Sequence, residues 1–400
     1  MKPTRSQYIA FGAAWVGWVL DAFDFTIFLL VMPQIEKEFG VHHVATTGSI
    51  ALTLLARLAG GYLAGKAADR WGRRLPLLVS VVWFALCDGA VAFAPSFQAI
   101  LVLRTLFGIG MGAEWTSGTT LAMESWPEKS KGIASGVLQG SWAIGYILAA
   151  AACAFVVPRF GWRALFVLAA APALLALPLR FWVEESPSFA LAEKAVSLRR
   201  TFARHPGLLA STLWGSLLMA AGFGAYYSLT GLYPTMLQTE LGLDVRATGK
   251  LVILFNVGML VGAVACGTIA ARKSVRLALA VPAFLGVLVL PLYVGAVPGA
   301  LGLGAFLGGM FGVGFSGVTP MLLTSLFPTA ARARLVGIVY HVGALFAGFV
   351  PMASAHIART TGLGLARTIL LVSTFLLLSL VVLVVGGRAR STVVLSGVST

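Results

Sequence analysis

The chain has 400 residues, of which 58% are hydrophobic and only 11% are charged, whereas a soluble domain carries about 25% charged residues. Because so few charges cannot cover a water-facing surface, the composition predicts a protein surrounded by the lipid bilayer. The formal net charge of +15 would favour nucleic acid as a partner, but the basic residues cluster in short loops between apolar runs. Membrane topology accounts for this basic excess, and we therefore exclude nucleic acid.

Twelve apolar runs occur along the chain, and each approaches the roughly 20 residues that a membrane helix needs. The first six cover about residues 8–32, 44–68, 75–94, 98–122, 132–157 and 162–182, and the second six cover about residues 208–237, 246–271, 276–297, 299–325, 332–357 and 364–387. One long polar connection separates the two sets. The sequence therefore predicts an all-α membrane protein, in which residues 1–182 form an N-terminal six-helix bundle, residues 183–207 a cytoplasmic linker and residues 208–400 a C-terminal six-helix bundle.

The loop charges predict how the chain is oriented. Basic residues favour the cytoplasmic side of a membrane, and here they are concentrated in alternate loops, from Lys2 and Arg5 to Arg388 and Arg390. We expect both termini to face the cytoplasm, in the bacterial inner membrane. No cleavable signal peptide is expected, because the first apolar run is too long and contains two aspartates.

The two sets of runs also repeat each other. Gly65–Arg74 corresponds to Gly267–Arg276, Gly110–Gly112 to Gly312–Gly314, and Glu124–Lys131 to Ser325–Arg332, each at an offset of about 200 residues. A duplicated six-helix unit is typical of transporters that rock two halves about a central site.

With these motifs the chain resembles the major facilitator superfamily over nearly its whole length. Gly65-x-x-x-Asp69-Arg70-x-Gly72-Arg73-Arg74 is similar to that superfamily's signature loop, Arg104-x-x-x-Gly108 to a weaker motif, and Glu185-Ser186-Pro187 to a motif of its metabolite-carrying branches. The second copy of the signature loop has Ala271 where the first has Asp69. Any salt-bridge latch should therefore be one-sided.

Within that superfamily, the chain most resembles the sialate:proton symporter family, which includes sialic acid and lactate/pyruvate permeases. The resemblance lies in Trp18–Phe25, Gly110–Trp115, Met123–Pro127 and Ser135–Gly140. Aromatic-acid:proton symporters have a similar paired-aspartate first helix and are the nearest alternative. Either branch implies transport of an organic acid anion, with the proton as the coupling ion and no other cofactor.

Charged side chains inside the apolar runs are functional candidates, because a charge at the bilayer centre costs about 2.5 kcal/mol or more. They are Asp21, Asp24, Arg57, Asp88, Arg104 and Glu114. At about 1.5 Å per helical residue, the two aspartates of the first run reach the depth of Arg104, whereas Arg57 and Glu114 share a deeper level. We expect Asp21 or Asp24 to meet Arg104, and Arg57 to meet Glu114. Asp88 is expected to have only a structural role.

Arginine can hold a carboxylate through two parallel hydrogen bonds, so Arg57 and Arg104 are expected to bind the anion. Asp21, Asp24 and Glu114 are expected to carry the proton, since the last five apolar runs contain no acidic residue. Protonating an acid would release its arginine for the incoming anion, and proton and anion would then load together. Side chains expected to complete the substrate site by hydrogen bonding or stacking are Gln139, Tyr226, Tyr227, Asn256, Tyr340 and His341.

The signature loop predicts a gate that is separate from the substrate site. Asp69 lies where its carboxylate could accept from the amides at the start of the run at about 332–357. Such contacts would latch the cytoplasmic side closed. The gating residues expected on this basis are Asp69, Arg70, Arg73, Arg74, Glu124, Lys131 and Arg332.

The sequence thus predicts a monomeric, proton-coupled symporter that imports an organic acid anion, such as lactate, pyruvate or sialic acid, by alternating access. Symport of an aromatic acid or a dicarboxylate stays open. A proton-driven exporter of drugs or metabolites also stays open, although buried arginines argue against cationic drugs and a sugar carrier would not need them. An enzyme is excluded, because the sequence has no nucleophile–base set or metal-ligand spacing, and Cys87, Cys153 and Cys266 each lie within an apolar run.

Overall fold

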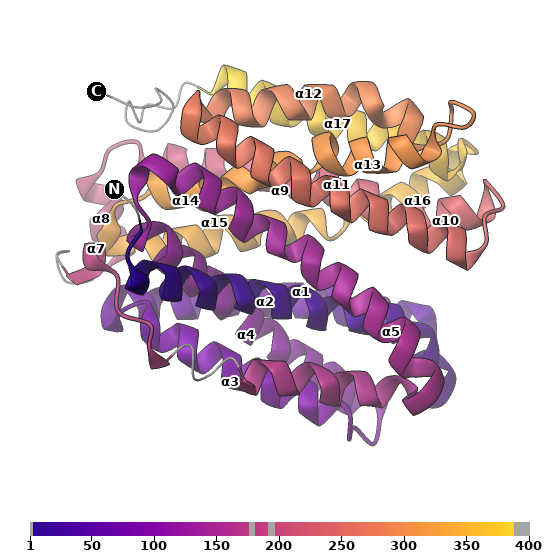
Figure 1. Ribbon diagram of the computed structural model, residues 1–400, viewed down its shortest axis with the longest axis horizontal. Helices are drawn as coiled ribbons and strands as arrows, with labels where there is room; N and C mark the ends of the chain where they lie inside the picture. The colour runs from indigo at the N-terminus through magenta and orange to yellow at the C-terminus, as the bar shows by residue number, and fades with distance from the viewer. Residues whose placement is uncertain (1–2, 176–180, 191–196, 388–400) are drawn as a thin grey trace. The chain divides into compact units, whose positions relative to one another are not determined.

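The computed structural model of the protein describes residues 3–175, 181–190 and 197–387. All regular structure in these ranges is helical (Figure 1). Lys2, Arg180, Lys194, Arg388 and Arg390, on which part of the expected orientation rests, lie outside the described residues, as do parts of the expected linker.

The first half of the chain forms α1 (Arg5–Phe39), α2 (His43–Trp71), α3 (Arg74–Val91), α4 (Phe97–Ser125), η1 (Glu128–Ser130) and α5 (Lys131–Leu175), followed by the short helices α7 (Pro187–Ala190) and α8 (Leu198–Arg204). Side-chain caps fix where several of these helices begin. Thr4 accepts from the amide of Gln7, whose side chain in turn accepts from the Thr4 amide. Ser96 caps α4 by accepting from the amide of Ala99.

Helix α5 contains the turn between two of the expected membrane runs. Gly161 has a φ of 77°, which is not helical, and glycine adopts this conformation without the steric penalty that a side chain would bring. α5 reverses its direction along its length (Figure 1). α5, which ends at Leu175, thus contains the run expected at about 132–157 and most of the run expected at about 162–182.

The second half forms α9 (Leu208–Thr230), α10 (Tyr233–Thr239), α11 (Val245–Arg272), α12 (Val275–Tyr293), α13 (Leu301–Gly312), η2 (Gly314–Val318), α14 (Thr319–Leu326), η3 (Thr329–Ala331), α15 (Arg332–Ala347), α16 (Val350–Thr361) and α17 (Gly364–Gly386). Several expected runs are therefore interrupted. Pro234 stands in the first turn of α10 and Pro351 in the first turn of α16. Proline is favoured at that position because its missing N–H has no partner in the helix, so each proline begins a new helix.

Eleven helical segments within the described ranges are long and apolar enough to cross a membrane. One of them, Glu128–Ala171, contains the turn at Gly161 and represents two of the expected runs. The prediction of an all-α membrane protein with about twelve membrane helices is confirmed, and the chain is a multi-pass membrane protein.

Helix packing divides the chain into two compact units. The first comprises Met1–Pro127, Ser141–Pro206 and Phe327–His341, and the second comprises Glu128–Gly140, Gly207–Leu326 and Val342–Thr400. Most of α15 therefore belongs to the first unit, although the sequence places it in the C-terminal bundle. The bundle boundaries proposed from the sequence stay a prediction.

Close helix contacts in the first unit position the charged side chains. α4 packs against α1, α2 and α3. At Gly112, on α4, a Cβ atom would overlap the carbonyl oxygen of Arg57 on α2, so only glycine allows this approach. The second unit uses the same device in its corresponding helix pair, where a Cβ atom at Gly262 on α11 would overlap the carbonyl oxygen of Met310 on α13.

Candidate substrate, proton and gating sites

Arg57 lies within an aromatic cage in the first unit. The residue is buried, with 2% of its surface exposed. Its guanidinium carbon lies 5.4 Å from the centre of the Trp18 ring and 5.6 Å from that of Tyr340, and Trp115 stacks on Tyr340 with ring centres 3.3 Å apart. We call Arg57, Trp18, Trp115 and Tyr340 the arginine cage. Cation–π contacts of this kind contribute about 0.5–2 kcal/mol each and use the faces of the rings, so the N–H donors stay available.

Three donors of the arginine cage lack acceptors among the described residues. Nε and Nη2 of Arg57 and Nε1 of Trp18 are buried and make no hydrogen bond with any residue that the structure describes. The contact that the structure describes for Glu114 is with the Ser80 hydroxyl, from which it accepts at 2.6 Å, and the expected pairing of Arg57 with Glu114 stays a prediction. A buried donor left unsatisfied costs about 1–3 kcal/mol, and more when the group is charged. The cage is therefore suited to an anionic ligand that supplies acceptor oxygens.

His341 lies next to the arginine cage but is bound to α4. Its Nε2 atom is 3.3 Å from Thr116 Oγ1 and 3.3 Å from the carbonyl oxygen of Gly112. The structure thus brings Arg57, Tyr340 and His341 together in one unit. A role for either α15 side chain in substrate binding stays a prediction.

A second buried charge cluster involves α1, α3 and α4. Arg104 Nη1 donates to Asp88 Oδ1 at 3.0 Å, and the guanidinium carbon lies 4.1 Å from the centre of the Phe107 ring. Asp88 therefore takes the place that the sequence assigns to Asp21 or Asp24, and the expectation that Asp88 has only a structural role stays a prediction. Asp24 contributes as an electrostatic neighbour of Arg104. The depth argument missed Asp88 because depth along a helix does not say which way a side chain points.

The remaining substrate candidates, Gln139, Tyr226, Tyr227 and Asn256, belong to the second unit. The amide nitrogen of Asn256 donates to the carbonyl oxygen of Val252 on its own helix, at 2.9 Å. The Tyr226 and Tyr227 rings lie edge to face with centres 5.3 Å apart, and Gln139 is buried with 6% of its surface exposed. Their roles in substrate binding stay predictions.

Asp69 anchors the signature loop to the start of α15. Its carboxylate accepts from the backbone amides of Ala333 and Arg334, both at 3.2 Å, and from Arg334 Nε at 2.9 Å. The sequence anticipates the amide contacts from the position of Asp69, but not the side chain of Arg334. All of these groups lie in the first unit.

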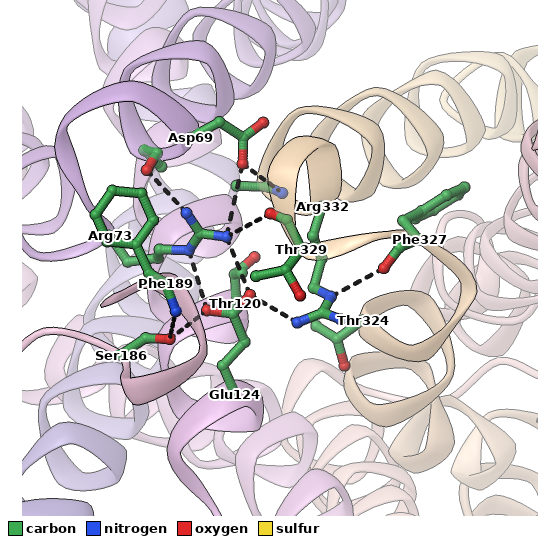
Figure 2. Close-up of polar contacts among 12 residues, drawn as sticks. Asp69, Arg73, Thr120, Glu124, Ser186, Phe189, Thr324, Phe327, Thr329 and Arg332 are labelled. Carbon is green, nitrogen blue, oxygen red and sulfur yellow. Dashed lines mark hydrogen bonds and ion pairs between the residues drawn. The ribbon is translucent and has the colours of Figure 1, made fainter. Parts of the chain in front are cut away.

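Glu124, at the end of α4, is the centre of the same contact network (Figure 2). Arg73 binds it through both Nε and Nη2, each at 3.0 Å, Arg332 Nη1 donates to it at 2.8 Å, and the Ser186 hydroxyl donates at 2.5 Å. Arg73 is fully buried, and its Nη2 also donates to the carbonyl oxygen of Thr329. We call Asp69, Arg73, Glu124, Arg332 and Arg334, together with Ser186, the charge latch.

Three other residues expected in the gate have different surroundings. Arg70 lies over the ring of Trp71, 5.3 Å from its centre. Arg74 donates to the carbonyl oxygen of Phe181 at 2.8 Å. Lys131 pairs with Glu128 and belongs to the second unit. The contacts that the structure describes for Arg70 and Arg74 do not include Glu124 or Asp69, so their expected gating role stays a prediction.

Glu185 completes the signature loop and was not expected there. Its two carboxylate oxygens accept from the backbone amides of Arg73 and Arg74, at 3.0 and 3.2 Å. Its neighbour Ser186 reaches Glu124. The sequence signal was the Glu185-Ser186-Pro187 motif, which marks a resemblance but does not say what its side chains contact.

The fold and these sites together define a polytopic membrane transporter built from two repeated sets of helices. The family model described as "Major Facilitator Superfamily" matches residues 14–351, and the chain belongs to this superfamily. Several of its relatives bear transporter names, and the protein is a transporter rather than an enzyme.

Several relatives are similar to the chain over most of its length. The sialic acid transporter NanX of Escherichia coli (strain K12) is 28% identical over 386 residues, 94% of this chain and 93% of the relative. The cis,cis-muconate transport protein of Acinetobacter baylyi is 27% identical and covers 90% of both chains. The probable 4-methylmuconolactone transporter of Cupriavidus pinatubonensis is 30% identical and covers 90% of this chain and 86% of its own. The resemblance to sialate and other organic acid permeases is thus confirmed.

Solved structures confirm the fold. The proton:xylose symporter XylE, bound to 6-bromo-6-deoxy-D-glucose, superposes with a TM-score of 0.79 at 17% identity and covers 95% of this chain and 96% of its own. The human organic anion transporter MFSD10 gives a TM-score of 0.74 at 18% identity, with 96% of this chain and all of the other covered. At these identities the likeness concerns the fold alone.

Proposed function

We propose that the protein is a proton-coupled symporter that imports an organic acid anion across the bacterial inner membrane as a monomer, with both termini in the cytoplasm. The observation that supports this most is the buried guanidinium of Arg57, whose Nε and Nη2 have no acceptor among the described residues. The planar fork of arginine matches the two oxygens of a carboxylate. A carboxylate that enters the arginine cage satisfies these donors and neutralises the charge.

The two arginines are not equivalent in this proposal. Arg104 already has a carboxylate partner in Asp88, whereas Arg57 has none among its described contacts. Arg57 is therefore assigned to the substrate and Arg104 to proton coupling, together with the acidic residues around it. Because only Arg57 is assigned to the substrate, we favour a ligand with one carboxylate bound at Arg57 over a dicarboxylate held by both arginines.

An aromatic or otherwise planar acid is the second candidate substrate. It is favoured by the Trp18 and Tyr340 rings beside Arg57 and by the Trp115 ring that stacks on Tyr340. Aromatic pairs contribute about 0.5–1.5 kcal/mol beyond the area they bury, which a small aliphatic acid such as lactate cannot use. The names of the muconate and methylmuconolactone relatives fit unsaturated acids, and that of NanX fits a larger sugar acid.

We assign the charge latch to alternating access. Its salt bridges hold the ends of α2 and α4 to the start of α15, and buried, bidentate ion pairs are stable only while their geometry is kept. The proposal is that they are intact when the cytoplasmic side is closed and break when it opens.

Uptake by the purified protein in proteoliposomes tests the function. Lactate, benzoate, sialic acid and cis,cis-muconate are offered to vesicles with an alkaline interior, and protein-free vesicles correct for passive entry of the uncharged acids. We expect at least one acid to accumulate, a protonophore to abolish the accumulation, and Arg57→Gln to abolish it as well. If none of the four acids accumulates while a cationic or neutral compound is transported, the proposed symport of an organic acid is wrong.

A further inference from the structure

His341 is held in place by two neighbouring helices. On α4, the carbonyl oxygen of Gly112 and the Thr116 Oγ1 atom each lie 3.3 Å from its Nε2 atom. On α2, a Cβ atom at Gly61 would lie 2.2 Å from Cδ2 of the ring, so only glycine leaves room for the imidazole. The ring is fully buried and lies edge to face with Tyr340, with ring centres 5.1 Å apart. These contacts fix the orientation of the ring.

The same contacts assign the proton of the imidazole. In a neutral ring one nitrogen donates and the other accepts. The carbonyl oxygen of Gly112 can only accept, so we assign the proton to Nε2 and a lone pair to Nδ1. Nδ1 is buried and has no hydrogen-bonding partner among the residues that the structure describes. His341 therefore presents an unsatisfied acceptor, which a ligand can satisfy only with an O–H or N–H group.

This acceptor lies close to the donors of the arginine cage. Arg57 precedes Gly61 by four residues on α2, and residues at this spacing lie on the same helix face about 5–6 Å apart. The ring centre of Tyr340 lies 5.6 Å from the guanidinium carbon of Arg57 and 5.1 Å from the centre of the His341 ring. In the His341 ring, Nδ1 is the atom opposite the Cδ2–Nε2 bond, which faces Gly61 and α4. Nδ1 therefore faces away from these two backbones.

The unsatisfied groups together describe the ligand. Among the described residues, Arg57 Nε and Nη2 and Trp18 Nε1 are donors without an acceptor, and His341 Nδ1 is an acceptor without a donor. The carboxylate of an unsubstituted acid satisfies the donors but has no hydrogen to donate to Nδ1. We propose that His341 determines specificity, and that the substrate is a hydroxy acid whose hydroxyl group donates to Nδ1 while Arg57 holds its carboxylate. This inference rests on the proposed function and narrows its class of substrates.

The proposal distinguishes acids that the carboxylate site alone does not. Lactate can place a donor at Nδ1, whereas pyruvate places a further acceptor there, and the two lone pairs repel each other. An unsubstituted acid leaves Nδ1 unsatisfied, and this weakens its binding. Because one neutral hydrogen bond changes an equilibrium by about threefold to tenfold, we expect the hydroxy acid to be preferred by a factor of this size.

Two substitutions separate the acceptor of His341 from its contact with α4. The side-chain amide of asparagine ends at the δ position and can place its oxygen near the position of Nδ1, whereas that of glutamine ends at the ε position and can donate to the Gly112 carbonyl oxygen as Nε2 does. His341→Asn should therefore keep the preference for a hydroxy acid, and His341→Gln should lose it. His356→Gln, at an exposed position, is the control for the same chemical change and should keep the preference.

Calorimetric titration of the purified protein measures the preference with matched ligands. Lactate, 3-hydroxypropionate and pyruvate are compared with propionate, and mandelate is compared with phenylacetate. We expect the wild type to bind at least one hydroxy acid about threefold to tenfold more tightly than its parent acid. His341→Gln should bring this ratio to about one while its affinity for the parent acid stays within about twofold of the wild type.

Three results would overturn the inference. They are equal binding of hydroxy and parent acids by the wild type, an unchanged ratio in His341→Gln, and a ratio that His341→Asn loses as fully as His341→Gln does. In each of these cases the acids still bind, so the proposed function stands. If the wild type binds none of these acids, the proposed function fails, and this inference fails with it.

Discussion

Replacing Asp69 with asparagine should weaken the charge latch while leaving the arginine cage unchanged. The aspartate accepts from two amides at 3.2 Å and from Arg334 Nε at 2.9 Å, and the carboxylate is buried with Arg73 3.7 Å away. Removing one partner of a buried ion pair costs about 3–5 kcal/mol. Because 1.4 kcal/mol is a factor of ten, the equilibrium between the latched and unlatched states should shift by about 100-fold or more.

The assay compares turnover with binding. Turnover in proteoliposomes should fall by about tenfold or more, because conformational steps limit many transport and catalytic cycles. Binding of the acid to the arginine cage, measured by calorimetry on the same preparation, should change much less. Asp244→Asn serves as the control for the same chemical change outside the latch, because Asp244 is an exposed N-cap and asparagine caps a helix equally well. Weakened binding with normal turnover would refute the assignment of Asp69 to the latch.

Three further substitutions test neighbouring parts of the account. Glu124→Gln removes the charge that Arg73 and Arg332 share and should slow turnover as Asp69→Asn does, while Glu128→Gln, at an exposed side chain, should not. Gly112→Ala puts a Cβ atom against the Arg57 carbonyl oxygen, and this overpacking should cost about 1–3 kcal/mol and lower both thermal stability and anion binding. Gly48→Ala, on the same helix as Arg57, adds a Cβ atom in open space and should lower neither. Trp115→Leu should weaken benzoate binding by about threefold to tenfold and lactate binding less. Trp182→Leu, at an exposed position, is the control and should change neither. Equal effects of Trp115→Leu on both acids would contradict a role for the aromatic rings in binding the substrate.

Membrane architecture could be predicted from the sequence because its signals are local. A run of about 20 apolar residues indicates a membrane helix whatever surrounds it. The sequence separates the run at about 132–157 from the run at about 162–182, although α5 is interrupted between them only at Gly161. The contact between Asp69 and the start of α15 could be predicted because the signature loop fixes the position of Asp69. The N-terminal end of a helix attracts a carboxylate through the helix dipole.

The arginine cage and the ion pair between Arg104 and Asp88 could not be predicted because both depend on the directions in which side chains point. The depth of Arg57 matches that of Glu114, yet the structure pairs Glu114 with Ser80. Nothing in the apolar run that contains Asp88 indicates that its side chain accepts from Arg104, as it does in the structure. Trp18 and Trp115 are aromatic residues in apolar runs, and nothing in such runs distinguishes a ring facing a cation from a ring facing lipid.

The buried donors of Arg57, as the site of the substrate carboxylate, are central to the proposed function. Calorimetric titration of the purified protein with the acid that it transports, compared between the wild type, Arg57→Lys and Arg57→Gln, tests this directly. Hydrogen bonds to charged groups contribute about 1.5–3 kcal/mol each, and Arg57→Gln removes two of them. We therefore expect Arg57→Gln to weaken binding of the acid by about 100-fold or more, and Arg57→Lys to weaken it less. Undiminished binding of the acid by Arg57→Gln would contradict it.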